Sequence, residues 1–331
     1  AYGFNNVNGI NTLKTGWELT LNATPFKNPN GFSWETTVNW STYKETLKSI
    51  YPGLPELALG NHNYRVGERL DDFYSTGFVR DGSGNIVYSG GGPLLATGTL
   101  DQKYKYLGHL NPDFSFGWSN RVSYKNVSLS FQIDGRVGGK IYDDIWYHAM
   151  NGGTAVESDQ GAIKAGRLGD WQAAKNNNGV IPATYTGTFV GKGVVIASGT
   201  PTYSGGQITN QKDITYAPNT TPIIIQSYLS SALGSNVDEY YTISRTFVKL
   251  REVQLSYAFS QKLLRKTLLK SATLSLVGRN LLYFAKRKDF DIDQYASGFN
   301  AADRSYEGTS NDVTLSSPTF RRFGFNLNCA F

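Results

Sequence analysis

The sequence is poor in residues that cross-link a chain or anchor it in a membrane by helices. In 331 residues it has one cysteine, Cys329, one methionine and three histidines. A lone cysteine cannot form an internal disulfide, so a disulfide framework is excluded. No stretch approaches the roughly 18 to 20 apolar residues that a membrane-spanning helix needs, so a helical membrane protein is excluded too. Residues 1–6 lack the features of a secretory signal, and we expect a mature chain or a portion of a longer one.

The sequence contains only part of a calcium-binding loop motif. Asp289, Asp291 and Asp293 have the alternate spacing of the first three calcium ligands in such a loop. Gln294 stands where the loop needs glycine, and Asn300 stands where it needs a bidentate glutamate. We therefore predict no metal site.

No motif for catalysis is complete either. The run Gly191-Lys192-Gly193 lacks the Ser or Thr after the lysine and the glycine spacing of a phosphate-binding loop, so a turn is favoured. The histidines are isolated, without zinc-type spacing, and we expect them to be hydrogen-bonded or exposed in loops: His62, His109 and His148. We predict no enzymatic activity and no cofactor.

The net charge of +6 does not indicate a nucleic-acid partner. Recognition of nucleic acid requires a basic face with interleaved stacking aromatics. The basic clusters here, at residues 262–270 and 286–288, lie beside the ends of expected strands. Solvated turns are the better interpretation.

What the sequence does contain is glycine, 36 residues, and aromatic residues, 14% of the chain. Seven segments alternate between apolar and small or polar residues, as β-strands with two unlike faces do. The apolar positions of the seven segments are Trp17, Leu19, Leu21 and Ala23; Phe32, Trp34, Thr36, Val38 and Trp40; Phe114, Phe116, Trp118, Asn120, Val122 and Tyr124; Val127, Leu129, Phe131 and Ile133; Val253, Leu255, Tyr257 and Phe259; Ala272, Leu274, Leu276 and Gly278; and Phe323, Phe325, Leu327, Cys329 and Phe331.

Charge is confined to the opposite face of these segments. A Lys or Arg that faces lipid at the bilayer midplane costs about 2–4 kcal/mol, which would explain why the apolar face carries no charge. A soluble β-sandwich also keeps charge off its inner face, but aromatic residues at the ends of the apolar face favour a membrane-interface girdle. We predict an all-β fold, an antiparallel transmembrane β-barrel. Its lumen-facing charges are expected to be Glu18, Glu35, Arg121, Asp134, Arg136 and Arg279.

The lengths of the connections support this interpretation. Short links at residues 27–31, 125–126 and 260–270 alternate with long ones that follow Tyr43, Tyr142 and Leu281. Outer-membrane barrels have short periplasmic turns and long extracellular loops, which places the C-terminus in the periplasm. Because seven is odd and bacterial barrels usually have even strand numbers, we expect further strands upstream of this chain.

Flat aromatic residues gather in the longest loop, between about residues 143 and 245. Short helices are expected near residues 145–150 and 225–233. The aromatic side chains would either contact a substrate or partner, or pack the loop against itself. The candidate binding residues are Trp146, Tyr147, Trp171, Tyr240 and Tyr241.

Several segments, taken in order, resemble the SusC-like (SusC/RagA) TonB-dependent outer-membrane transporters of Bacteroidetes. The matching segments are Gly16-Trp17-Glu18-Leu19 with Phe32-Ser33-Trp34-Glu35-Thr36; Leu107-Gly108-His109-Leu110-Asn111-Pro112-Asp113-Phe114; Phe247-Val248-Lys249-Leu250-Arg251-Glu252-Val253-Gln254-Leu255-Ser256-Tyr257; Gly278-Arg279-Asn280-Leu281; and Phe320-Arg321-Arg322-Phe323-Gly324-Phe325-Asn326-Leu327. They extend across the whole chain. The acidic segment after Asn280 differs from the Asp-Pro-Glu motif that is usual in the family, so the resemblance implies no role for it.

The resemblance implies that residues 1–331 are the C-terminal part of a 22-stranded barrel whose N-terminal plug and first strands are not in this chain. It also implies a SusD-like lipoprotein over the outer mouth, an energising contact with TonB through the missing N-terminal region, and contact with outer-membrane lipid. The predicted function is TonB-dependent import of an oligomeric nutrient, a glycan or a peptide. The alternatives are an outer-membrane barrel with a structural or partner-binding role and a soluble β-sandwich enzyme.

Overall fold

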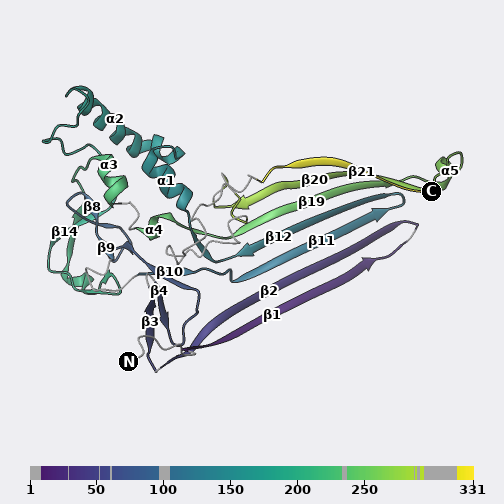
Figure 1. Ribbon diagram of the computed structural model, residues 1–331, viewed down its shortest axis with the longest axis horizontal. Coiled ribbons are helices and arrows are strands. Elements are labelled where there is room, and N and C mark those ends of the chain that lie inside the picture. Colours follow the sequence, from purple (N-terminus) through teal and green to yellow (C-terminus); the bar gives the residue numbers. More distant parts are fainter. Residues whose placement is uncertain are drawn as a thin grey trace, which may run out of the picture.

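The fold is dominated by one antiparallel sheet with a compact group of loops at one end (Figure 1). The computed structural model describes residues 9–28, 30–51, 53–59, 62–96, 105–232, 237–286, 288, 291–293 and 319–331. The sheet has seven strands in the order β1-β2-β11-β12-β19-β20-β21. Their bounds are β1 Ile10–Phe26, β2 Phe32–Ile50, β11 Phe114–Tyr124, β12 Val127–Val137, β19 Phe247–Ala258, β20 Ser271–Ala285 and β21 Arg322–Ala330.

These are the seven strands that the alternating pattern predicts, and each is hydrogen-bonded antiparallel to the next. Three short connections join strands at one end of the sheet and three long ones at the other, as predicted (Figure 1). The last strand, β21, pairs with β20 over Ser271–Arg279, which is also the predicted partner. No helix in the described part of the chain is long and apolar enough to cross a membrane.

The first two strands are longer than predicted. The sequence pattern ends the second strand near Ser41, where Lys44, Glu45 and Lys48 interrupt it, but β2 continues to Ile50. Past the ends of the other strands, where β1 is the only strand of the sheet that pairs with β2, the β1–β2 hairpin no longer has one apolar and one polar face. It is held instead by cross-strand contacts such as the 2.6 Å hydrogen bond from Thr12 to Glu45.

The apolar side chains of the sheet form continuous rows across the strands. In the registers of the sheet, neighbours on the apolar face follow one another from strand to strand without a charged residue. Four such rows are Leu19–Trp40–Phe116–Gly135–Val248–Phe284; Leu21–Val38–Trp118–Ile133–Leu250–Leu282; Trp34–Val122–Leu129–Leu255–Leu276–Phe325; and Phe32–Tyr124–Val127–Tyr257–Leu274–Leu327.

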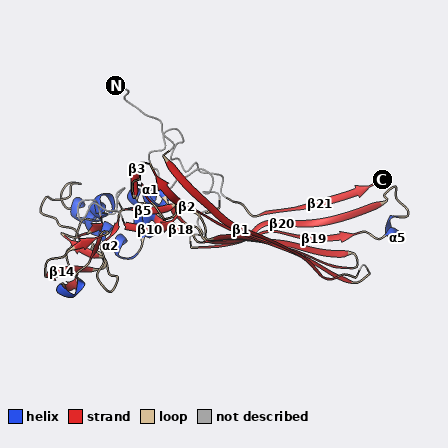
Figure 2. Ribbon diagram, turned by 90° about the horizontal axis from the view of Figure 1, so that it is seen from below, coloured by secondary structure: helices blue, strands red, loops and turns tan. Residues whose placement is uncertain are grey.

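Most of this apolar face is exposed in the described chain, although Ala272 at its turn end is buried. Trp17 is 76% exposed, Phe323 77% and Phe325 74%. Figure 2 shows the sheet as a curved layer that extends away from the described loops. Large contiguous apolar surfaces that are exposed in this way mark contact with a membrane or a partner protein.

Polar residues within the apolar rows are shielded by tryptophan side chains. Thr36 and Asn120 are directly paired, and both belong to the apolar face by register. The indole N–H of Trp118 donates to Thr36 Oγ1 at 3.0 Å, and that of Trp34 donates to Asn120 Oδ1 at 3.0 Å. Trp118 therefore lies in the middle of β11, within the apolar rows, where its indole pairs with a polar neighbour.

The long connections between β2 and β11 and between β12 and β19 fold together into what we call the loop module (Figure 1). Its strands are β3 Glu56–Leu59, β4 His62–Arg65, β5 Asp72–Ser75, β6 Gly77–Phe78, β7 Val87–Ser89, β8 Gly92–Pro93, β9 Leu95–Ala96, β10 Lys105–His109, β13 Lys140–Tyr142, β14 Val194–Ser198, β15 Tyr203–Ser204, β16 Gln207–Ile208, β17 Thr215–Pro218 and β18 Thr242–Ser244. Its helices are α1 Asp144–Gly152, η1 Val156–Asp159, α2 Gly161–Lys175, η2 Gln211–Asp213, α3 Ile225–Ser227, η3 Tyr228–Ala232 and α4 Asp238–Tyr241. The short helix α5 Gln261–Leu264 lies in the β19–β20 connection.

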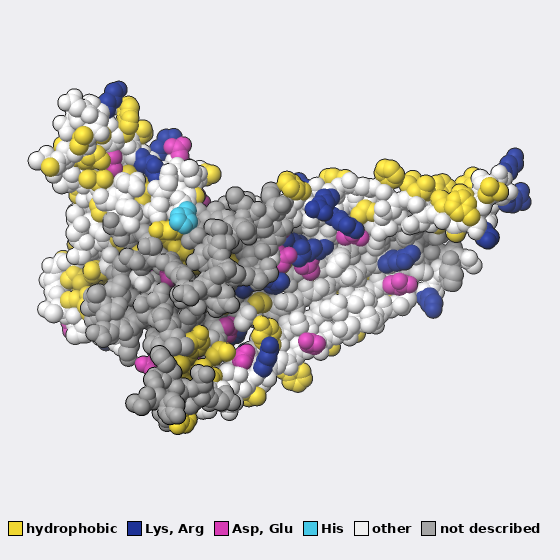
Figure 3. Space-filling model, in the orientation of Figure 1, with side chains coloured by type: hydrophobic (Ala, Val, Ile, Leu, Met, Phe, Trp, Pro, Cys, Tyr) yellow, Lys and Arg dark blue, Asp and Glu magenta, His cyan; other side chains and the backbone are white. Residues whose placement is uncertain are grey.

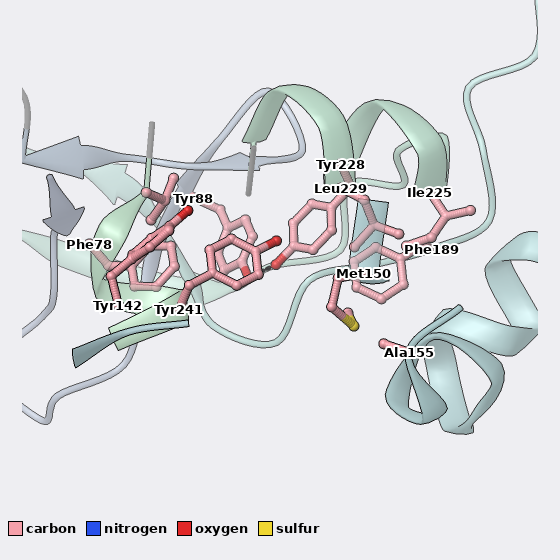
Figure 4. Packing of buried hydrophobic residues seen from close by; sticks show 11 residues of the cluster. Phe78, Tyr88, Tyr142, Met150, Ala155, Phe189, Ile225, Tyr228, Leu229 and Tyr241 are labelled. Atoms are coloured by element: carbon pink, nitrogen blue, oxygen red, sulfur yellow. Dashed lines mark hydrogen bonds between the residues drawn. The ribbon is translucent and has the colours of Figure 1, made fainter. Parts of the chain in front are cut away.

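The loop module has its own core, to which both long connections contribute (Figure 4). Tyr88 comes from the first connection and Tyr228 from the second, and their hydroxyls lie 3.2 Å apart. The predicted helix near residues 145–150 is confirmed as α1, whose N-cap Asp143 accepts a hydrogen bond from the backbone N–H of Trp146 at 2.8 Å. The second predicted helix is found as α3 with the π-helical turn η3.

Candidate functional site

The polar face of the sheet is the candidate functional surface, and it too is organised in rows. From the loop end to the turn end these rows are Glu18–Ser41–Ser115–Arg136; Thr20–Asn39–Gly117–Asp134–Lys249; Asn22–Thr37–Ser119–Gln132–Glu252–Arg279–Arg322; Glu35–Arg121–Ser130–Gln254–Val277–Gly324; and Ser33–Ser123–Ser128–Ser256–Ser275–Asn326. Charge is concentrated toward the loop end, and the last row consists of hydroxyls and one amide. Figure 3 shows basic and acidic side chains on the visible face of the sheet, with apolar ones along its rims.

All six charged residues predicted to face a lumen lie on this polar face. Arg279 donates to Glu252 Oε2 at 2.7 Å, and Arg136 lies 3.4 Å from Asp293. Asp134 accepts two hydrogen bonds from Arg251, of which the one from Nη2 is 2.8 Å long. The other three residues lie opposite polar partners in the register: Glu35 opposite Arg121, and Glu18 opposite Ser41.

Two cations of the polar face, Lys249 and Arg251, are missed by sequence reasoning because the alternation of β19 is interrupted. Leu250 pairs with Ile133 and Glu252 pairs with Gln132, so Arg251 is an extra residue in β19. Such a β-bulge shifts the period and allows two successive side chains to reach one face. The pairing of β19 with β20 is interrupted at the same place, and there Asn280 of β20 has a positive φ of 54°. The signal in the sequence is the pair of charges Arg251-Glu252, which no strict alternation accommodates.

Four of the five predicted binding aromatics pack against one another in the loop module. Trp146 stacks on Tyr240 with ring centroids 5.2 Å apart, and Tyr147 meets Tyr241 edge to face at 5.2 Å. Tyr241 is fully buried. Burial raises the pKa of Tyr241, and the neighbouring Tyr240 and Tyr147 raise it further. These four rings form part of the core, where they stabilise the loop module.

The fifth aromatic, Trp171, lies on α2 and is 57% exposed. The Nζ atom of Lys175, one turn further along the helix, lies 4.8 Å from the centre of the indole ring. This cation–π contact orients the ring without covering it. In Figure 1, α2 lies at the end of the loop module that is remote from the sheet. Trp171 is therefore the one residue of the predicted set whose ring is presented to solvent.

Glu239 joins the two long connections at the centre of the loop module. It accepts hydrogen bonds from Arg80 Nη2 and Lys105 Nζ, both at 2.9 Å, and from the backbone N–H of Phe78 at 2.6 Å. Burial acts to raise the pKa of Glu239, but the hydrogen bonds from Lys105, Arg80 and Phe78 outweigh it and leave the pKa below the ordinary value of 4.5. The ionised form is therefore the one that the fold stabilises.

A pH dependence of the loop module follows from this site. Because the folded-state pKa of Glu239 is lowered, its contribution to stability is present above pH 4.5 and is lost as the pH falls below that value. We expect Glu239→Gln to unfold the module at lower guanidinium concentration than the wild type at pH 7. The difference between the two proteins should shrink at pH 3, as followed by tryptophan fluorescence. A difference of equal size at both pH values would contradict this role.

The glycine-lysine-glycine run is a packing feature rather than a phosphate loop. A Cβ atom at Gly191 or at Gly193 would collide with the ring of Tyr88. The side chain of Asn219 donates to the carbonyl of Gly191 at 2.9 Å, and its backbone N–H donates to that of Gly193 at 3.0 Å. The two glycines allow this segment to lie against the ring of Tyr88.

Among the described residues there is no group of three or more potential metal ligands, and the acidic run after β20 contacts cations of the protein instead. Of its three aspartates, Asp289 lies outside the described residues. His109 Nε2 lies 3.0 Å from Asp113 Oδ1, and His148 is exposed, as expected for loop histidines. The side chain of His62 lies outside the described residues.

A two-faced antiparallel sheet with short turns at one end and long loops at the other is the arrangement found in walls of outer-membrane barrels. No family model matches the sequence. Two curated relatives come from Formosa agariphila. TonB-dependent receptor P26 is 23% identical over 98% of this chain and 30% of its own length, and TonB-dependent receptor P3 is 23% identical over 96% of this chain and 28% of its own length.

Solved structures of the RagAB peptide importer have the same fold. The match to the structure of its open-open state covers 86% of this chain and 26% of the RagAB chain, with a TM-score of 0.52 and 17% identity. A further RagAB peptide transporter structure gives a TM-score of 0.53 at 16% identity, over 86% of this chain and 27% of that chain.

These similarities confirm the resemblance to SusC-like TonB-dependent transporters that the sequence motifs indicate. The chain spans less than a third of the length of the relatives and structures that it matches. The names of these proteins denote receptors and transporters, in line with the expectation that the chain is not an enzyme.

Proposed function

We propose that the chain forms the C-terminal part of the wall of an outer-membrane β-barrel. The observation that carries the proposal is the set of uncharged apolar rows that face away from the polar rows across all seven strands. The 11 residues of β11 and of β12 match the roughly 9 to 11 residues that a tilted strand needs to cross the bilayer. The apolar rows then contact lipid and the polar rows line the lumen.

In this arrangement the barrel continues beyond both outer strands of the sheet, β1 and β21, to a total of 22 strands. The short turns lie in the periplasm with the C-terminus, and the loop module lies outside the cell. This orientation rests on the alternation of short and long connections. The plug and the TonB-interacting segment belong to the part of the protein upstream of residue 1.

The function that we propose is TonB-dependent import of an oligomeric nutrient, a glycan or a peptide, under a SusD-like lipoprotein. The hydroxyl and amide groups of the polar rows offer hydrogen bonds along the route without fixing one charge type. The loop module, with its own core and partly buried ion pairs, is a preformed platform at the mouth. Trp171 is its exposed contact residue for the substrate or the lipoprotein.

The experiment for this role is uptake by native cells that carry Trp171→Ala. We expect uptake to fall about thirtyfold, because tryptophans at binding surfaces are frequent hot spots that contribute about 2 kcal/mol or more. Val156→Ala, which removes another exposed apolar side chain of the loop module, should leave uptake unchanged. Trp146→Ala is unsuitable as a test, because that ring stacks on Tyr240 in the core.

The outcome also separates transport from the alternative, a barrel with a structural or partner-binding role. Loss of a co-purifying lipoprotein together with uptake would identify Trp171 as a partner contact within the transporter. Unchanged uptake together with a lost partner would favour the alternative. Unchanged uptake with the partner retained would remove Trp171 from the binding surface.

A further inference from the structure

The acidic run that follows β20 has a role that its calcium-like spacing does not suggest. Asp291 accepts a hydrogen bond from Lys249 Nζ on β19 and another from Thr319 Oγ1. Asp293 accepts from Arg251 Nη2 at 2.6 Å, and its carboxylate also lies 3.4 Å from Lys249 Nζ and 3.4 Å from Arg136 Nη2. Two carboxylates of a connection are thus held by three cations of the sheet.

Lys249 is the centre of this network and is almost completely buried. Its side chain is 2% exposed, compared with 8% for Asp291 and 16% for Asp293. Its Nζ atom lies 5.2 Å from the ring centre of Phe247 and 5.3 Å from that of Tyr283. Lys249 is therefore enclosed by two aromatic rings and two carboxylates, and it has little access to water.

The residue between the two aspartates is buried as well. Ile292 is 2% exposed and packs in a cluster with Ile141, Ile243 and Phe247. Its backbone N–H donates to the hydroxyl of Tyr283 at 3.0 Å. Residues 291–293 are thus fixed to the sheet by an apolar side chain as well as by charge.

The network joins parts of the chain that are far apart in sequence. Asp291 follows β20 and Thr319 precedes β21, so one carboxylate holds both described ends of the β20–β21 connection. Ile141 and Ile243 belong to β13 and β18, which pair where the β12–β19 connection leaves the sheet. The bases of two long connections therefore meet at Lys249.

The energetics of buried charge make this junction sensitive to the loss of one partner. A buried ion pair contributes little net stability compared with an apolar replacement, but removal of one partner leaves an uncompensated buried charge, which is strongly destabilising. Residues 291–293 cannot leave the sheet without exposing Lys249 unpaired. The network thus selects one arrangement of the connections over others.

We propose that Lys249 is a positioning residue that fixes the bases of the β20–β21 and β12–β19 connections on the polar face of the sheet. Arg251 and Arg136 share the task by holding Asp293, and the bulge in β19 brings Arg251 to that face. This role goes beyond the proposed function, since it does not depend on what the protein carries.

The test is thiol labelling of residue 292 in native cells, in a Cys329→Ser background that removes the one cysteine of residues 1–331, with labelling compared to the same background without a cysteine at position 292. Cys introduced by Ile292→Cys should react slowly with a water-soluble maleimide, because Ile292 is 2% exposed. Adding Lys249→Met, which keeps an unbranched side chain one atom shorter and removes its charge, should speed labelling about tenfold or more, because the aspartates lose their buried partner and residues 291–293 detach from the sheet. Labelling at Val156→Cys, 69% exposed, should be fast in both backgrounds.

A double variant separates positioning by charge from simple packing. Lys249→Met with Asp291→Asn removes both charges of the pair, and labelling of residue 292 should return to within about threefold of the starting rate. If labelling in the double variant is as fast as in Lys249→Met alone, the role is packing and the proposal is overturned. Unchanged labelling in Lys249→Met would overturn it as well.

One further variant covers the case in which Lys249→Met prevents assembly in the outer membrane. Asp291→Asn alone leaves Lys249 its second carboxylate, Asp293, and removes the negative charge from the contacts of residue 291 with Lys249 and Thr319. We then expect a smaller rise in labelling, about threefold, with normal amounts of protein in the membrane. No rise in this variant would overturn the proposal.

Discussion

Replacing Ile133 by arginine should prevent assembly of the protein in the outer membrane or strongly reduce it. Ile133 belongs to the apolar row of Val38, Trp118 and Leu250, with further apolar rows on both sides of it. If these rows face lipid, the guanidinium at this depth costs about 2–4 kcal/mol. That is a large fraction of the net stability of a typical folded domain, which is about 5–15 kcal/mol.

The neighbouring residue provides a matched control for this prediction. Gln132 lies on the polar face, in the row of Ser119 and Glu252, so Gln132→Arg places the same side chain one residue away, on the face that we propose lines the lumen. Heat-modifiable migration of the barrel on gels and its amount in outer-membrane fractions measure assembly. We expect Gln132→Arg to assemble normally. Equal tolerance of both substitutions would contradict the assignment of the two faces.

Expression of residues 1–331 alone should not give a folded monomer. The sheet ends at β1 on one side and at β21 on the other, and neither strand has a second partner among the described residues. The nine residues of β21 are all exposed. An exposed apolar edge with unpaired backbone groups invites pairing with other chains and aggregation.

This prediction is checked by refolding the purified chain in detergent and measuring its mass by light scattering. We expect aggregates or heterogeneous oligomers, with strand content that depends on concentration. Co-refolding with the upstream part of the same protein should reduce the aggregation, because the edges then find their partners. A monodisperse monomer with cooperative thermal unfolding would contradict the proposal that this sheet is one part of a larger barrel wall.

The strands of the sheet could be predicted from the sequence because their two faces meet different surroundings over their whole length. Where the two faces of a strand no longer differ, its extent could not be predicted, as for β2 from Lys44 onward. Helix α2 could not be predicted because Gly166 and Gly169 interrupt its pattern. Both glycines serve tertiary packing: a Cβ at Gly166 would lie 3.0 Å from that of Phe189, and one at Gly169 would collide with Thr188.

The residues of the candidate site could be predicted where the alternation along a strand determines which face a side chain is on. The six charged positions predicted for the polar face follow from alternation. Lys249 precedes a bulge that alternation does not reveal, and Arg251 is the extra residue of that bulge. Residue type alone could not separate Trp171, which is exposed, from Trp146, which stacks on Tyr240. That difference depends on contacts between segments that are far apart in sequence.

The most direct test of the account is a nitroxide scan of β12 from Val127 to Val137 in the protein reconstituted in lipid. Power-saturation measurements report how strongly each label is exposed to oxygen, which concentrates in lipid, and to a water-soluble nickel chelate. We predict a period of two, with oxygen favoured at Leu129, Phe131 and Ile133 and the chelate favoured at Ser128, Ser130 and Gln132. A pattern without this alternation, or with the two sets exchanged, would contradict the conclusion that the sheet is a membrane wall with a polar lumen face.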